Sequence, residues 1–128
     1  MISQNLMKGD WVLHEGQIKR VDLDWGNGYV SLYGGETWST IYDKKSKEEC
    51  DPVPLTQEIL YKNTYDENTN TYRVYNTQGV TQYSLSDLFI VRWYENETYP
   101  RYEGLPLHSV HELQHLLEIA GVDRKIVI

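Results

Sequence analysis

The chain has 128 residues and carries 12 Lys and Arg against 19 Asp and Glu, which gives a formal net charge of −7. Hydrophobic residues make up 40% and include eleven Tyr and four Trp, an aromatic content that disordered chains lack. The single cysteine, Cys50, excludes an intramolecular disulfide and a multi-cysteine zinc knuckle. At this length the chain is predicted to form one domain with a sizeable core.

The sequence favours a cytoplasmic location. No stretch approaches 18 consecutive apolar residues, so no membrane span and no membrane partner are expected. Residues 1–8 lack the basic and apolar segments of a signal peptide, so secretion is not expected. A lone cysteine agrees with a reducing compartment.

The N-terminal part has the pattern of short antiparallel strands. β-Branched and aromatic residues alternate with turn residues and predict strands at 11–13, 18–23, 29–33 and 38–42. In the second of these, Val21 and Leu23 are expected to share a face. The opening residues 8–12 resemble the first strand of a small SH3-like barrel, so residues 1–50 are predicted to form an SH3-like β meander.

A charged segment and a short helix follow. Residues 43–51 contain seven charged side chains, three positive and four negative, which predicts a solvated connector and not a basic arm for nucleic acid. Thr56 is a suitable N-cap for a helix, and Asn63 suits the left-handed position beyond its C-terminus.

The C-terminal part is predicted to combine a second antiparallel sheet with one long helix. Strands are expected at 72–75 and 80–83, and the apolar run 88–94 predicts a central strand buried on both faces. An amphipathic helix is expected over 110–120, stopped by Gly121, with a last strand over 125–128. The predicted fold is therefore α+β, a single domain over 1–128 with a β meander in 1–50 and an α+β part in 51–128.

Three blocks of sequence resemble a known family. They are Gly9-Asp10-Trp11-Val12, Pro52-Val53-Pro54-Leu55-Thr56-Gln57-Glu58-Ile59-Leu60 and Val110-His111-Glu112-Leu113-Gln114-His115-Leu116. Together they resemble a family of small uncharacterised proteins from Bacteroidales bacteria and their phages. The resemblance covers nearly the whole chain and implies no enzymatic activity. It implies an intracellular accessory protein, often encoded by a phage or prophage.

The third block also matches a zinc-peptidase motif. His111-Glu112-Leu113-Gln114-His115 fits H-E-x-x-H, in which the two His bind zinc and the Glu activates water. On a helical wheel His111 and His115 lie opposite the apolar stripe, so they are expected to face a cleft or water.

Three observations favour a structural role for the same residues. Ser109 and Glu112 form a capping-box pattern, in which Ser109 accepts from the Glu112 amide and Glu112 reaches back to the Ser109 amide. A catalytic zinc needs a third protein ligand, which His14 or a distant carboxylate would have to supply. The family resemblance implies that Glu112 can be Gln and that His115 can vary.

The remaining chemistry is sparse. Cys50 has no His nearby in the sequence, which favours an inert thiol over a nucleophile. The glycine pairs are interpreted as hairpin turns, and the carboxylates are interpreted as a solvated acidic surface. No catalytic residue, no metal ligand and no cofactor is therefore predicted in the preferred interpretation.

The preferred function is a non-catalytic binding module that contacts an unidentified protein partner. Assembly into a homo-oligomer is left open. Its support is the abundance of Tyr and Trp, which recur as interface anchors. Two alternatives stay open. One is a zinc-dependent hydrolase with Glu112 as the base and His111 and His115 as metal ligands. The other is a single-stranded nucleic-acid binder on an SH3-like barrel, which the net charge of −7 opposes, so no nucleic-acid partner is expected.

Overall fold

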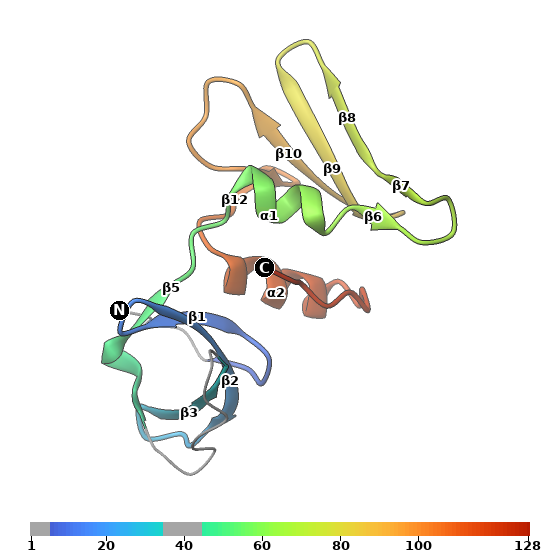
Figure 1. Cartoon of the computed structure of the whole chain (residues 1–128). Helices are drawn as coiled ribbons and strands as arrows, with labels where there is room; N and C mark the ends of the chain where they lie inside the picture. The colour runs from blue at the N-terminus through green and yellow to red at the C-terminus, as the bar shows by residue number, and fades with distance from the viewer. Residues whose placement is uncertain (1–5, 35–44) are drawn as a thin grey trace. The chain divides into compact units, whose positions relative to one another are not determined.

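The computed structural model describes residues 6–34 and 45–128. The chain divides into two compact units, Met1–Val53 and Pro54–Ile128, each of which is considered by itself below (Figure 1). The described residues form antiparallel sheets and two α-helices, so the predicted α+β class is confirmed. None of the helices in the described ranges has the length and apolar character that a membrane crossing needs.

The first unit is built on a five-stranded antiparallel sheet. Its strands follow the order β4-β3-β2-β1-β5. They are β1 (Trp11–His14), β2 (Gln17–Asp24), β3 (Tyr29–Tyr33), β4 (Lys45–Ser46) and β5 (Cys50–Pro52), with the 3₁₀ turn η1 (Lys47–Glu49) between the last two. The first three predicted strands are confirmed, and the strand predicted at 38–42 lies outside the described residues.

Two expectations for this unit are wrong. The predicted connector over 43–51 instead supplies β4, η1 and β5 from residue 45 onward, and Cys50, which pairs with His14 of β1, is fully buried. Val21 is fully buried but Leu23 is exposed, since a bulge between these two residues shifts the pairing of β2 with β3. The core of the sheet is formed by Leu6, Val12, Val21, Val30, Leu32 and Cys50.

The second unit contains a five-stranded antiparallel sheet and a separate two-stranded one. The larger has the order β12-β11-β10-β9-β8, and the smaller pairs β6 with β7. The strands are β6 (Tyr65–Asp66), β7 (Thr71–Tyr72), β8 (Val74–Thr77), β9 (Val80–Ser86), β10 (Phe89–Tyr94), β11 (Arg101–Tyr102) and β12 (Leu105–Pro106).

Two strand predictions here need correction. The strand expected over 72–75 is split at Arg73, whose N–H donates to the Thr64 carbonyl while its own carbonyl accepts from the Ser84 N–H. The run 88–94 does lie within the sheet as β10, but burial alternates along it and Leu88 is 89% exposed at the preceding turn. The strand therefore packs one face into the core instead of two.

Both helices begin where the capping residues predict. Thr56 caps α1 (Gln57–Lys62) by accepting from the Ile59 N–H at 3.2 Å, and Ser109 caps α2 (Val110–Ile119). Gly121 follows α2 with a φ of 71°, the left-handed conformation that ends a helix. The core of this unit includes Leu60, Phe89, Val91, Leu113 and Leu117.

The C-terminal segment is not a strand, contrary to the prediction for 125–128. The side chain of Asn63 takes the place of a strand partner. Its Nδ2 donates to the Val127 carbonyl at 2.8 Å, and its Oδ1 accepts from the Val127 N–H at 2.9 Å. Asn63 is also not left-handed, since its φ is −91°. The residue that was expected to end a helix through its backbone conformation instead binds the C-terminal segment through its side-chain amide.

Among the described residues, three of the two-residue turns that join neighbouring strands share one backbone conformation. They are Glu15–Gly16 between β1 and β2, Gln78–Gly79 between β8 and β9, and Glu103–Gly104 between β11 and β12, and both φ angles are positive in each. Positive φ at both central positions is the mark of a type I′ turn, whose twist matches that of the strands it joins.

Candidate functional site

The H-E-x-x-H residues lie in the first half of α2. Ser109 Oγ accepts from the Glu112 N–H at 3.4 Å, which confirms the predicted cap. Glu112 does not bond the Ser109 amide as expected. Its Oε2 instead accepts from the His108 N–H at 3.1 Å and lies 3.4 Å from His108 Nδ1. The carboxylate therefore binds the backbone one residue earlier than a capping box requires.

The expectation that His111 faces a cleft or water is wrong, because its side chain is only 3% exposed. His111 Nδ1 lies 3.1 Å from Ser109 Oγ, so one ring nitrogen is engaged at the helix N-terminus. The His111 and His115 rings meet edge to face with centroids 5.8 Å apart. This pair packs as aromatic rings do.

A third zinc ligand is not assembled beside this pair. Within residues 6–34 and 45–128, no group of three or more His, Cys, Asp or Glu side chains is placed to hold a metal ion. His14, the ligand that the sequence offered, has both ring nitrogens engaged within its own unit. The absence of a metal site stays a prediction, to be tested in solution.

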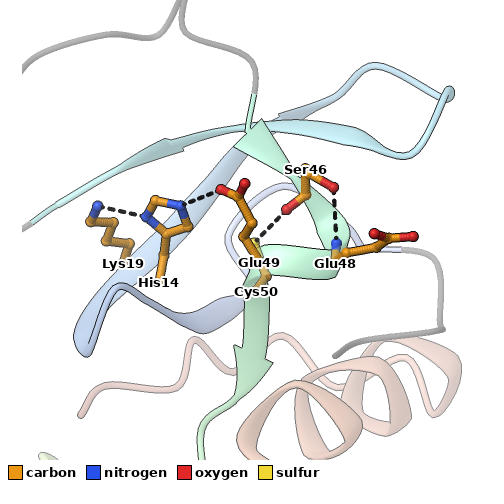
Figure 2. Close-up of polar contacts among 6 residues, drawn as sticks. All are labelled: His14, Lys19, Ser46, Glu48, Glu49 and Cys50. Atoms are coloured by element: carbon orange, nitrogen blue, oxygen red, sulfur yellow. Dashed lines mark hydrogen bonds and ion pairs between the residues drawn. The ribbon is translucent and has the colours of Figure 1, made fainter.

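The other buried histidine, His14, forms a polar site in the first unit with partners from two further elements (Figure 2). It is 1% exposed, its Nδ1 lies 3.1 Å from Lys19 Nζ, and its Nε2 lies 3.4 Å from Glu49 Oε2. An ammonium group can only donate, so Nδ1 accepts from Lys19 and the Nε2–H of the neutral ring donates to Glu49. The two partners come from β2 and η1 and fix the ring from both sides.

Cys50 lies opposite His14, because the two are paired residues of β5 and β1. Sequence reasoning missed this neighbour, since 36 positions separate the two residues and no local signal connects them. The thiol is fully buried, and its Sγ–H donates to the Ser46 carbonyl at 3.7 Å. Burial, with the nearby charges of Glu49 and Asp51, raises the pKa of the Cys50 thiol. The reactive thiolate is disfavoured, so this Cys–His pair lacks the activation that a nucleophile needs.

The first unit also stacks an arginine between aromatic rings. The Arg20 guanidinium carbon lies 4.7 Å from the centre of the Trp11 ring and 5.9 Å from that of Tyr33. The three residues are cross-strand neighbours on β1, β2 and β3. Because the guanidinium takes up ring faces on which bases would stack, this arrangement does not favour the nucleic-acid interpretation.

Three tyrosines of the second unit form a surface cluster, here called the tyrosine patch: Tyr61, Tyr65 and Tyr72. The Tyr61 and Tyr72 rings stack with centroids 4.3 Å apart, and Tyr65 meets Tyr72 edge to face at 5.0 Å. Tyr61 and Tyr72 are 45% and 47% exposed. Contact between the rings fixes their orientation while large areas stay open to a partner.

The tyrosine patch adjoins a polar groove of about 780 Å³, which Tyr65 also lines. The charged residues along the groove are balanced in sign: Lys62, Arg73, Arg124 and Lys125 against Asp66, Glu67, Asp87 and Asp123. Arg73 is already paired with Asp87 at 2.8 Å, and Arg124 donates to the carbonyls of Asn63 and Tyr65. A balanced lining suits a polar chain of mixed charge better than an anion or a cation.

Comparisons of the chain with protein-family models, with curated proteins and with solved structures find no match. The resemblance to the Bacteroidales and phage family therefore stays a hypothesis from the three sequence blocks.

Proposed function

We propose that this protein is a non-catalytic binding module that acts through a protein partner. The observation that carries the proposal is the tyrosine patch of Tyr61, Tyr65 and Tyr72 beside the charge-balanced groove. Exposed, mutually packed tyrosines offer large contact area with little side-chain entropy left to lose on binding. The groove supplies polar groups of both signs, which a peptide segment of a partner can satisfy.

The proposal for the first unit is an SH3-like barrel. Its support is the strand order β4-β3-β2-β1-β5, with a 3₁₀ turn that joins the two outer strands β4 and β5. The setting that we propose is cytoplasmic, and the biological role is that of a phage or prophage accessory protein. The lone cysteine and the resemblance of the three sequence blocks support these two points.

A library of random peptides displayed on phage tests the binding proposal without a known partner. The wild-type chain is immobilised and compared with a Tyr61→Ser/Tyr72→Ser variant, which removes the stacked pair. The matched control is Tyr29→Ser, an equally exposed tyrosine of the other unit. We expect peptides enriched on the wild type and the control to lose at least about tenfold in affinity for the double variant, equivalent to about 1.4 kcal/mol.

Two results would contradict the proposal: no sequence enriched above background, or equal enrichment on the double variant. Circular dichroism of each variant shows that a loss of binding does not reflect unfolding.

The zinc-hydrolase alternative has the weaker support. Glu112, its catalytic base, accepts from the His108 backbone, and His111 is buried against Ser109. Titrating the wild type with Zn²⁺ and assaying hydrolysis of a mixed peptide pool tests it directly. Zinc-dependent turnover that is lost in both Glu112→Gln and His115→Ala would promote the hydrolase over the binding module.

A further inference from the structure

Strand β8 is the outer strand of the larger sheet in the second unit, with β9 on one side (Figure 1). Thr77 pairs with Val80 across the two-residue turn, and Tyr75 pairs with Gln82. In an antiparallel ladder the residue facing such a turn exchanges both hydrogen bonds with its partner, and the next residue along faces away. The N–H and C=O groups of Val74 and Asn76 therefore point out from the sheet edge.

The edge lacks the features that commonly protect one. Proline, a lysine, a bulge or extreme shortness discourages pairing with another chain. The opposite edge has two of these, since β12 is two residues long and ends in Pro106. Strand β8 has four residues, none of them charged and none a proline. Tyr75 at its middle is 64% exposed.

The charge pattern identifies the partner that this edge suits. Residues 74–86 contain no Asp, Glu, Lys or Arg, the longest such run in a chain of net charge −7. Two copies of an acidic chain repel each other over most of their surfaces, and contact through β8 places no charged side chains opposite one another.

We propose that β8 pairs with β8 of a second copy of this chain, antiparallel and about a twofold axis at Tyr75. Val74 of each copy then faces Asn76 of the other, and both residues exchange their N–H and C=O hydrogen bonds. Tyr75 faces Tyr75 of the second copy in the close, non-hydrogen-bonded type of pair, where aromatic side chains pack best. The two larger sheets become one continuous sheet. This contact is separate from the tyrosine patch proposed for a partner.

The contact is short, and interfaces of limited area are weak. We expect a reversible dimer with a dissociation constant on the order of 0.1 to 1 mM, seen as a rise in average mass across that range by sedimentation equilibrium. Tyr75→Lys places two ammonium groups face to face and should raise the dissociation constant at least about tenfold. Tyr29→Lys makes the same change in charge on the other unit and should leave it unchanged.

Backbone amide shifts locate the contact. Between dilute and concentrated samples, the amide resonances of Val74 and Asn76 should move with the average mass, while those of the inward-facing Tyr75 and Thr77 should move less. A mass that stays monomeric up to about 1 mM overturns the proposal, as does a dimer that leaves the β8 amides unshifted or is equally strong in Tyr75→Lys. Circular dichroism shows that each variant retains its fold.

Discussion

The two units bury one histidine each, and they do so by different means. His14 lies in a strand between Lys19 and Glu49, groups that the sequence places 5 and 35 positions away. His111 lies in the first turn of a helix beside Ser109, two positions away. The histidine in the recognisable motif thus contacts the capping serine two positions away, whereas the one outside any motif also joins a residue 35 positions away. A motif indicates residue types, and only the fold decides which of them meet.

The largest effect should come from a core change that tests whether the two units unfold together. Phe89 is fully buried and stacks on Tyr102 with ring centroids 3.9 Å apart. Phe89→Ala should cost about 3–5 kcal/mol of stability, measured by urea unfolding. The sequence predicts one cooperative unit, so amide hydrogen exchange should accelerate equally in 6–34 and in 54–128. Faster exchange confined to 54–128 would show that the units unfold separately.

Removal of His14 should have the next largest effect. His14→Ala leaves a cavity beside Cys50 and removes the shared partner of Lys19 and Glu49, so we expect a loss of about 2–4 kcal/mol. His14→Gln keeps one acceptor and one donor and should lose less. A loss below about 0.5 kcal/mol for His14→Ala would mean that the network does not stabilise the unit.

In the second unit, the Asn63 side chain takes the place of a strand partner for the C-terminal segment. Asn63→Ala removes two hydrogen bonds to Val127 and one to the Ile59 carbonyl. The expected loss is about 1–3 kcal/mol, with faster hydrogen exchange at the Val127 amide. Asn63→Asp keeps the acceptor but sets a carboxylate oxygen against the Ile59 and Val127 carbonyls, so it should cost at least as much as Asn63→Ala. Unchanged exchange at Val127 would contradict this role.

Ser109 and Glu112 separate the capping role from the catalytic one. Ser109→Ala should cost about 1 kcal/mol, because the Glu112 N–H loses its acceptor. Glu112→Gln keeps an oxygen for the His108 N–H and should cost only a few tenths of a kcal/mol, on the order of the difference between charged and neutral caps. Thermal melting of both variants measures this order. A larger loss for Glu112→Gln would contradict it.

The smallest effect concerns the ion pair between Lys47 and Asp24, in which Lys47 Nζ lies 2.9 Å from Asp24 Oδ2. Burial alone would raise the pKa of the Asp24 carboxyl, but hydrogen bonds from Lys47 and the Gly26 N–H, together with the Lys47 charge, hold this pKa below its usual value. The lowered pKa stabilises the fold at pH values above the pKa of this carboxyl in the unfolded chain, near 3.8. That stabilisation is lost as the pH falls through the pKa of the folded state.

Lys47→Met should therefore cost up to about 1 kcal/mol at pH 7, and the difference from wild type should shrink as pH falls below about 3.8. Urea unfolding at pH 7, 4 and 3 measures it, with Lys8→Met as the exposed-lysine control from the same unit. A difference that is independent of pH would show that Lys47 acts through packing instead of charge.

The elements that the sequence predicted correctly are those with local signals. The caps at Thr56 and Ser109 and the stop at Gly121 depend on groups within one turn of the helix. The failures depend on long-range pairing. Cys50 is buried because β5 pairs with β1. The Asn63 side chain hydrogen-bonds a residue 64 positions further along the chain. His111 is a further failure, because it is buried although the helical wheel places it on the polar side.

The three type I′ turns have a consequence for the order of folding. Each sets the register of its hairpin from adjacent residues alone, and a hairpin can form within about 1–10 μs. Pairing of β1 with β5 instead joins Val12 to Pro52 and must close the chain between them. Closure of a long segment is slower than zipping a hairpin, because its entropy is lost before its contacts form. We therefore expect the hairpins to form early, and the docking of β5, which seals Cys50 and His14 inside, to complete the first unit.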